Sequence, residues 1–194
     1  MFFQEFGKYE LSLRENIAAY RTQATAVFQD FVRYEMNLGD NIGLGNLAAV
    51  NERRMIERAA KLGGVARFLH QLGQKYDTQL GRLFAGRSLS GGEWQRIALS
   101  RAFMREDVAA LLILDEPSSA LDVFMEEDVF QRMRDLMKNK TVVIVSHRLS
   151  TARHADYVVY MEQGRIMETG THDQLLVNGA GYAELYNMQA QKYR

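Results

Sequence analysis

The stretches Leu89-Ser90-Gly91-Gly92-Glu93 and Leu111-Leu112-Ile113-Leu114-Asp115-Glu116 decide the fold of this chain. In the first stretch, the serine and the glutamate have the spacing of a helix capping box, with two glycines between them. Main-chain N–H groups at such a helix start attract phosphate, and glycine allows a phosphate to come close. The same residues would also suit a plain helix cap, and one serine can serve as both cap and anion contact.

The second stretch is an apolar run that ends in two carboxylates. Such short runs are typical of strands covered on both faces of a parallel sheet, and open α/β sheets hold their ligands at the carboxyl ends of the strands. One carboxylate there can hold Mg²⁺ while the next orients an attacking water. We expect Asp115 to take the metal role and Glu116 to be catalytic, although Asp-Glu-Pro is also an ordinary turn after a strand.

A histidine, His147, follows the next apolar run, Thr141 to Val145. Parallel strands present their carboxyl ends at the same edge of a sheet, so we expect His147 to approach Asp115 and Glu116. An imidazole there can donate a hydrogen bond to a terminal phosphate or position a water, which makes His147 a second candidate catalytic residue. The other histidines, for which we expect structural roles, are His70, His154 and His172.

Hydrophobic periodicity predicts the remaining elements. The predicted strands are residues 24–28, 108–114, 141–145, 157–160 and 165–167, the last two forming a hairpin around Gln163-Gly164. The predicted helices are a helical region from about 46 to 83, a helix over 90–103, a helix between Val123 and Met137, and a tail that Thr171 and Gln174 open with a capping box.

Part of the sequence is repeated. Residues 3–17 line up with residues 28–42 at an offset of 25 positions, and most differences are conservative. Two copies are too few for a stacked-repeat fold. Because a predicted strand precedes only the second copy, we assign the working role to Gln29 rather than to Gln4, and we expect residues 1–23 to be a duplicated, poorly packed segment.

Composition narrows the class of protein. The chain has 194 residues, 47% of them apolar, which is enough for one sizeable core. The number of lysines plus arginines equals that of aspartates plus glutamates, at 24 each. The chain therefore has no net positive charge that would favour nucleic acid as a partner. The absence of cysteine excludes disulfides and cysteine metal sites, and we expect neither a membrane span nor a secretory signal.

One expected motif is absent. The 194 residues of the sequence do not contain the pattern Gly-x-x-x-x-Gly-Lys-Ser/Thr, which forms the loop that binds nucleotide phosphates.

Taken together, the motifs resemble those of the nucleotide-binding domain of ABC exporters. The resemblance lies in the signature-like 89–93, the Walker B-like 111–116, the D-loop-like Ser119 to Asp122, the switch-like His147 and the Q-loop-like Gln29. It implies an α/β fold with a P-loop-NTPase-like parallel sheet core, incomplete because the phosphate-loop strand is missing. An α-helical subdomain, at about 43–104, is inserted in a partial ATPase domain over 24–194.

The resemblance also implies a site and partners. ATP and Mg²⁺ would be the ligands, and ATP hydrolysis would power transmembrane export. Two such domains would form a head-to-tail dimer beneath a transmembrane domain, on the cytoplasmic side of the cell membrane. The implied ATP-binding residues are Gln29, Ser90, Gly91, Gly92, Glu93 and Asp122, the metal residues are Asp115 and Gln29, and the catalytic residues are Glu116 and His147.

The missing phosphate loop has two expected consequences. The isolated chain should hydrolyse ATP negligibly, because Mg²⁺ at Asp115 would lack its usual phosphate and hydroxyl ligands. The strands 141–145 and 157–160 should flank a gap, which would leave strand edges and apolar surface exposed and would make the chain marginally stable.

Two other interpretations stay open. The C-terminal lobe of a chromosome-organising or DNA-repair coiled-coil ATPase naturally lacks a phosphate loop. It would, however, carry a long heptad region and no Q-loop on the same piece. The chain could also be a non-catalytic partner that lends its signature motif to a complete subunit.

Overall fold

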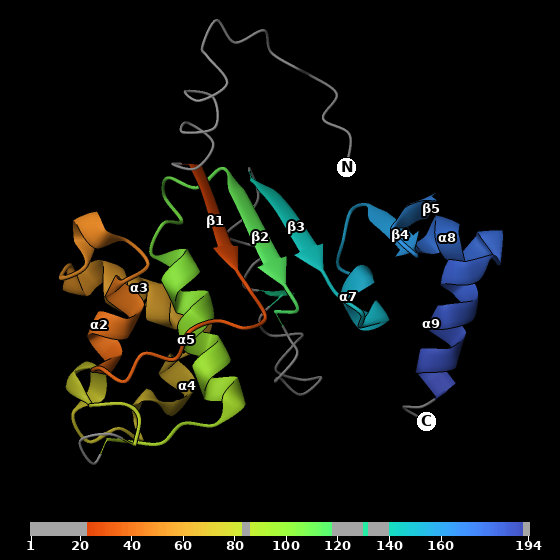
Figure 1. The fold of residues 1–194 in the computed structure, drawn as a ribbon. Helices are drawn as coiled ribbons and strands as arrows, with labels where there is room; N and C mark the ends of the chain where they lie inside the picture. The colour runs from red at the N-terminus through yellow and green to blue at the C-terminus, as the bar shows by residue number, and fades with distance from the viewer. Residues whose placement is uncertain (1–22, 83–85, 118–129, 132–139, 192–194) are drawn as a thin grey trace, which may run out of the picture. The chain divides into compact units, whose positions relative to one another are not determined.

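The computed structural model describes residues 23–82, 86–117, 130–131 and 140–191 (Figure 1). Contacts along the chain divide it into two compact units, one ending at Val145 and the other beginning at Ser146. The first copy of the repeat, the D-loop-like Ser119 to Asp122, and all but residues 130–131 of the helix predicted between Val123 and Met137 lie outside the described residues. The part of the chain described contains no helix with the length and apolar character needed to cross a bilayer.

A three-stranded parallel sheet lies in the first unit. It consists of β1 (Ala24–Val27), β2 (Leu111–Asp115) and β3 (Thr141–Val145), in the order β1-β2-β3. Leu112 and Leu114, which share one face of the central strand, are 1% and 0% exposed, whereas Leu111 and Ile113 on the other face are half-buried. Among the described residues β3 pairs only with β2, so the described sheet ends there. The predicted parallel α/β core is confirmed.

The start of β2 differs from the prediction. The apolar run was expected to be a strand from Val108, but β2 begins at Leu111 and Val108 is 58% exposed. The N–H of Val108 donates to the carbonyl oxygen of Arg105 at 3.1 Å, so this residue belongs to the turn that follows a helix. Apolarity alone did not separate the turn from the strand.

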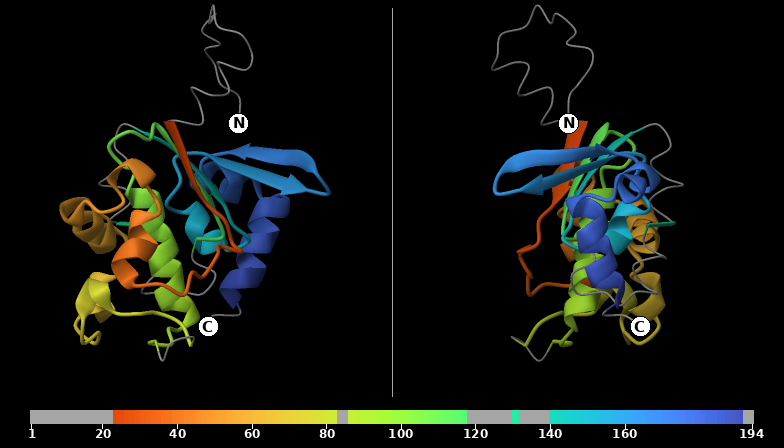
Figure 2. Two further views of the ribbon diagram at one scale, coloured as in Figure 1. Left: turned by 60° about the vertical axis from the view of Figure 1, so that its left-hand side comes forward. Right: turned by 90° about the vertical axis from the view of Figure 1, so that its right-hand side faces the viewer.

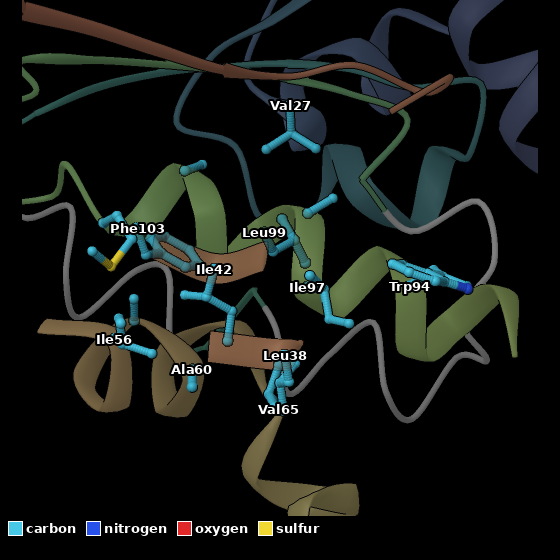
Figure 3. Close-up of a cluster of buried hydrophobic side chains, with 14 of the residues drawn as sticks. Val27, Leu38, Ile42, Ile56, Ala60, Val65, Trp94, Ile97, Leu99 and Phe103 are labelled. Carbon is cyan, nitrogen blue, oxygen red and sulfur yellow. The ribbon is translucent and has the colours of Figure 1, made fainter. Parts of the chain in front are cut away.

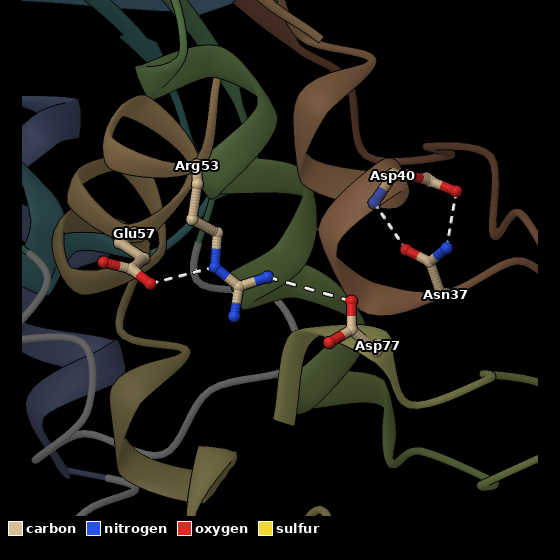
Figure 4. Close-up of polar contacts among 5 residues, drawn as sticks. All are labelled: Asn37, Asp40, Arg53, Glu57 and Asp77. Carbon is tan, nitrogen blue, oxygen red and sulfur yellow. Dashed lines mark hydrogen bonds and ion pairs between the residues drawn. The ribbon is translucent and has the colours of Figure 1, made fainter. Parts of the chain in front are cut away.

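The first unit also contains helices, and Figure 1 shows those among its described residues gathered beside the sheet. They are α2 (Leu38–Gly43), η1 (Leu47–Ala49), α3 (Arg53–Gly63), α4 (Ala66–Leu69), η2 (Lys75–Asp77) and α5 (Gly91–Phe103). The side chain of Asn37 caps α2 by accepting a hydrogen bond from the N–H of Asp40 at 2.7 Å (Figure 4). Arg53 forms ion pairs with Glu57 and Asp77. The helical region and the helix over 90–103 are confirmed.

Helix α5 lies at the centre of the hydrophobic core (Figure 3). The core brings together Val27 of β1, Leu38 and Ile42 of α2, Ile56 and Ala60 of α3, and Trp94, Ile97, Leu99 and Phe103 of α5. Gly63 allows α3 to approach α5 closely, because a Cβ added there would lie 2.0 Å from the Oγ of Ser100. The close contact between α3 and α5 therefore depends on a residue without a side chain at position 63.

The second unit contains α7 (Leu149–Ala152), β4 (Val158–Glu162), β5 (Arg165–Gly170), α8 (His172–Asn178) and α9 (Gly181–Gln191). Strands β4 and β5 form the predicted antiparallel hairpin, which Figure 2 shows as an extended ribbon. The predicted capping box between Thr171 and Gln174 opens α8. Leu149, Leu175 and Tyr182 form a small core of this unit.

We predict that Gly63→Ala lowers the free energy of unfolding by about 1–3 kcal/mol, the usual cost of forcing extra volume into a packed interior. Urea denaturation measures the change. Gly73→Ala is the matched control, because a Cβ added at Gly73 meets nothing within 4 Å and the variant should stay within about 0.5 kcal/mol of the parent. Equal stability of the two variants would contradict the close approach of α3 and α5.

Candidate functional site

The carboxyl edge of the sheet gathers three of the predicted site residues. Val27 of β1 pairs with Leu114 of β2, so Gln29, which follows β1, lies at the same edge of the sheet as Asp115, the last residue of β2, and Glu116 after it. The side chain of Gln29 is exposed, that of Asp115 is half-buried, and Glu116 is 7% exposed. The register therefore supports the predicted neighbourhood of Gln29 and the acidic pair.

The main chain of Glu116 adopts an uncommon conformation that is held from two sides. Its φ angle is 48°, in the left-handed region that non-glycine residues rarely adopt, and such a conformation persists only where the surroundings enforce it. The N–H of Glu116 donates to the carbonyl of Val145 at 2.9 Å, and its own carbonyl accepts from the Nε2 of Gln95 at 3.0 Å. Gln95 was not among the predicted site residues, because a polar residue beside Trp94 on the helix predicted over 90–103 carries no signal of its own.

The first turn of α5 carries the signature-like residues. The Oγ of Ser90 accepts from the N–H of Glu93 at 3.3 Å, and the carboxylate of Glu93 accepts from the N–H of Ser90 at 2.7 Å. The predicted capping box is confirmed. Ser90 and Gly91 are exposed, whereas Gly92 and Glu93 are half-buried. Because the first N–H groups of a helix have no partner within it, this turn can present donors to an anion.

Arg101, near the end of α5, holds the segment that follows Gln29. Its guanidinium donates to the carbonyls of Val32 at 2.7 Å and of Asn41 at 2.9 Å, and also to the Oδ1 of Asn41. It lies over the ring of Tyr34 at 4.9 Å from the centroid. Burial lowers the pKa of Arg101, and the nearby Tyr34 partly opposes this shift. Arg101 was not among the predicted site residues, because a basic residue late in a helix is also a common terminal feature.

A cavity of about 290 Å³ opens beside the same segment. Its lining includes Phe28, Asp30, Phe31, Tyr34 and Arg101. Phe28 is 60% exposed, and the neighbouring Val32 is 56% exposed. Large apolar side chains that are exposed together around a hollow are typical of interaction surfaces.

His147 belongs to the second unit, two residues after β3. Its side chain is exposed, and its main-chain carbonyl accepts from the Nε2 of Gln189 at 2.9 Å. The Oε1 of Gln189 accepts in turn from the N–H of Leu149 at 3.1 Å. The approach of His147 to Asp115 and Glu116 stays a prediction, and Asp122 lies outside the described residues.

The residues at the sheet edge fit Mg²⁺ only in part. Asp115 and Gln29 offer a carboxylate and an amide oxygen, which are ligands that Mg²⁺ accepts. Among the described residues no group of three or more His, Cys, Asp or Glu side chains could enclose a metal ion. The donor set therefore suits an ion that takes its other ligands from phosphate and water.

A family model described as ABC transporter matches residues 5–119, more than half of the chain. The match includes Gln29, the signature-like stretch and the acidic pair, and it ends before Asp122 and His147.

Curated relatives agree with this match. The ATP-dependent lipid A-core flippase of Shewanella sp. (strain MR-4) is 47% identical over 137 residues, which are 71% of this chain and 22% of the relative. The subtilin transport ATP-binding protein SpaT of Bacillus subtilis is 43% identical over 175 residues, 90% of this chain and 24% of the relative. The chain thus spans about a quarter of the length of these relatives.

A solved structure, of a bacterial Atm1-family ABC exporter with ATP bound, is similar with a TM-score of 0.78 and 36% sequence identity. The similarity covers 88% of this chain and 29% of the exporter chain. The α/β fold is therefore that of an exporter's ATP-binding region.

We predict that Ser90→Ala lowers the free energy of unfolding by about 1 kcal/mol, because alanine cannot accept the bond from the N–H of Glu93. Thermal or urea denaturation measures the loss. Ser90→Asp should stay close to the parent, since aspartate caps helices as well as serine does. If both variants were equally destabilised, the hydroxyl would not be acting as a cap.

Proposed function

Since this chain belongs to the ABC transporter family and is by family an ATPase, we propose that it works as part of an exporter's nucleotide-binding domain. In this role the first turn of α5 faces the triphosphate of an ATP held by a second nucleotide-binding domain. Gln29, Asp115, Glu116 and His147 belong to the chain's own half-site. The two domains associate head to tail.

One observation carries the proposal. Helix α5 has Ser90 and Gly91 at an exposed first turn, while its buried body reaches the turn of Glu116 through Gln95. A phosphate arriving at this turn would meet a hydroxyl, main-chain donors and the positive end of the helix dipole. The same helix then supports both the anion contact and the candidate catalytic carboxylate.

The chain by itself should hydrolyse ATP negligibly. Its residues contain no Gly-x-x-x-x-Gly-Lys-Ser/Thr to enclose the β- and γ-phosphates. Asp115 and Gln29 alone would hold Mg²⁺ weakly, because phosphate oxygens usually complete such sites. We accordingly assign residues 24–194 to a partial ATPase domain with an inserted helical subdomain at about 43–104, and residues 1–23 to a duplicated copy of the Gln29 segment.

We assign the surface around the 290 Å³ cavity to the second proposed partner, a transmembrane domain. Exposed Phe28 and Val32 flank Gln29 and offer an apolar contact, with the exposed Asp30 as a polar group at the cavity. In this arrangement the chain lies on the cytoplasmic side of a membrane and couples ATP hydrolysis to export.

Titration with MgATP tests the proposal, first with the chain alone and then with a partner domain. The partner is a relative's ATP-binding domain that carries Gly-x-x-x-x-Gly-Lys-Ser/Thr and whose own signature serine is replaced by alanine. We expect no turnover by either protein alone and measurable turnover by the mixture. Tight MgATP binding by the chain alone would contradict the proposal that its own half-site lacks the phosphate-binding loop. An inactive mixture would contradict the proposal that Ser90 to Gly92 contact the ATP held by the partner domain.

Gly91→Asp separates the anion contact from the helix cap. An acidic residue in the first turn favours the helix by about 0.3–1 kcal/mol, so the variant should be at least as stable as the parent. The added carboxylate repels phosphate, so turnover of the mixture should be lost.

The matched control is Gly73→Asp, at a glycine whose added Cβ would meet nothing within 4 Å. It adds the same charge away from α5, and it should change neither stability nor turnover. Undiminished turnover of the Gly91→Asp mixture would rule out a phosphate at this turn.

A further inference from the structure

We propose that Glu93 determines which form of a triphosphate the first turn of α5 accepts. Its carboxylate shifts the preference of this turn from the metal-free triphosphate towards the Mg²⁺-bound one. The inference rests on the proposed function, which places a phosphate at this turn. ABC domains bind ATP, so the family match, which includes Glu93, points to the same ligand independently of the helix start.

The carboxylate of Glu93 is held beside the N-cap residue of α5. One of its oxygens accepts from the N–H of Ser90 at 2.7 Å, and the N–H of Glu93 donates to the Oγ of Ser90 at 3.3 Å. These two bonds form the capping box, in which Glu93 is the acidic residue of the first turn. A negative charge is thus fixed at the place where the free N–H groups of the helix begin.

This carboxylate acts on a phosphate through its charge alone. A carboxylate and the oxygens of a phosphate are all hydrogen-bond acceptors, whereas the hydroxyl of Ser90 and the first N–H groups of α5 are donors. Glu93 therefore repels the anion that its neighbours attract. Because Glu93 is half-buried, salt screens this repulsion less than it would between fully exposed charges.

The strength of the repulsion depends on whether the triphosphate carries a metal ion. Metal-free ATP has a charge of about −4 and MgATP of about −2, because the ion neutralises part of the triphosphate. Coulomb energy is proportional to the product of the charges, so the carboxylate penalises the metal-free form more strongly. The helix dipole has the opposite effect, since it attracts the more highly charged anion more strongly. Glu93 thus offsets a preference for metal-free ATP that the helix start alone would have.

Glu93 differs in its effect from an aspartate at position 91. The carboxylate of Glu93 is bonded back to the N–H of Ser90, whereas Gly91 is exposed and an aspartate there would stand at the open surface of the turn. The repulsion from Glu93 is therefore weaker than that expected for Gly91→Asp. It selects between two forms of the ligand without excluding phosphate from the turn.

The N–H of Gly91 allows binding at this turn to be measured in the full chain. Ser90-Gly91 is the only Ser-Gly pair of the sequence, so ¹³C-carbonyl serine with ¹⁵N-glycine isolates the amide resonance of Gly91. Titration with ATP in EDTA, and separately with MgATP, gives two dissociation constants for the same place. We expect both ligands to bind weakly and to shift the resonance. The ratio of the constant for metal-free ATP to that for MgATP is the quantity that Glu93 should raise.

Glu93→Gln removes the charge and keeps the capping box, in which glutamine can form the same bond. At an ionic strength of about 0.02 M we expect MgATP to bind about threefold and metal-free ATP about tenfold more tightly than in the parent. The ratio should then fall about threefold, and this fall should vanish at about 1 M salt, where the Debye length is about 3 Å. An unchanged ratio at low salt would overturn the proposal.

Glu93→Ala separates the charge from the hydrogen bond. It removes both, so the ratio should fall as it does in Glu93→Gln, while the urea midpoint of the chain should fall only in the alanine variant. A ratio that falls in Glu93→Ala but not in Glu93→Gln would assign the effect to the bond with Ser90 and would overturn the role of the charge.

The matched control is Glu52→Gln, which removes the same charge at the start of α3. Gly63 at the end of α3 lies against the middle of α5, and Arg58 pairs with Glu106 after the end of α5. Towards its start α3 therefore runs away from Ser90, and the side chain of Glu52 makes no capping bond. The ratio should stay at the parent value in Glu52→Gln. An equal fall in Glu52→Gln and Glu93→Gln would overturn the proposal, because the net charge of the chain would then explain it.

The titration separates the failure of this inference from that of the proposed function. If neither form of ATP shifts the Gly91 resonance in the parent or in Glu93→Gln, the anion contact at the turn is refuted, and the role of Glu93 with it. If both forms shift it and the parent and Glu93→Gln give the same ratio, the anion contact stands and only the role of Glu93 is refuted.

Discussion

Burial of α5 imposes the constraint on which the arrangement of the site depends. From Trp94 to Phe103 this helix is buried apart from half-exposed Arg101, so its polar groups must find partners inside the protein. Gln95 bonds to the turn of Glu116, and the Oγ of Ser100 donates to the carbonyl of Arg96 at 2.8 Å. These bonds fix the rotation of the helix about its axis, and its first turn, with Ser90 and Gly91, is exposed.

The same helix connects elements that are far apart in the sequence. Gln95 reaches the strand end that carries Asp115 and Glu116, and Arg101 binds the segment that follows Gln29. Glycine contributes to this arrangement, since Gly63 brings α3 against the middle of α5. The candidate site therefore depends on packing within the helical region as well as on the sheet.

Much of the fold could be predicted because its signals are local. Apolar runs predicted β2 and β3, and the spacing of Ser90 with Glu93 predicted the start of α5. Val108 was assigned wrongly because an apolar turn residue has the same character as a strand residue. The left-handed Glu116 and the partners of Gln95 could not be predicted, because they arise only when the turn and the buried helix meet. Asp122 lies outside the described residues, and the approach of His147 to the acidic pair stays a prediction.

The position of Trp94 has an optical consequence. It is the only tryptophan of the chain, it is 5% exposed, and it lies four positions after the N-cap serine of α5. Indole emission depends on the polarity around the ring, and excitation at the red edge of its absorption avoids the 9 tyrosines. The chain thus carries an intrinsic fluorophore that reports from a single place, beside the helix start where an anion would arrive.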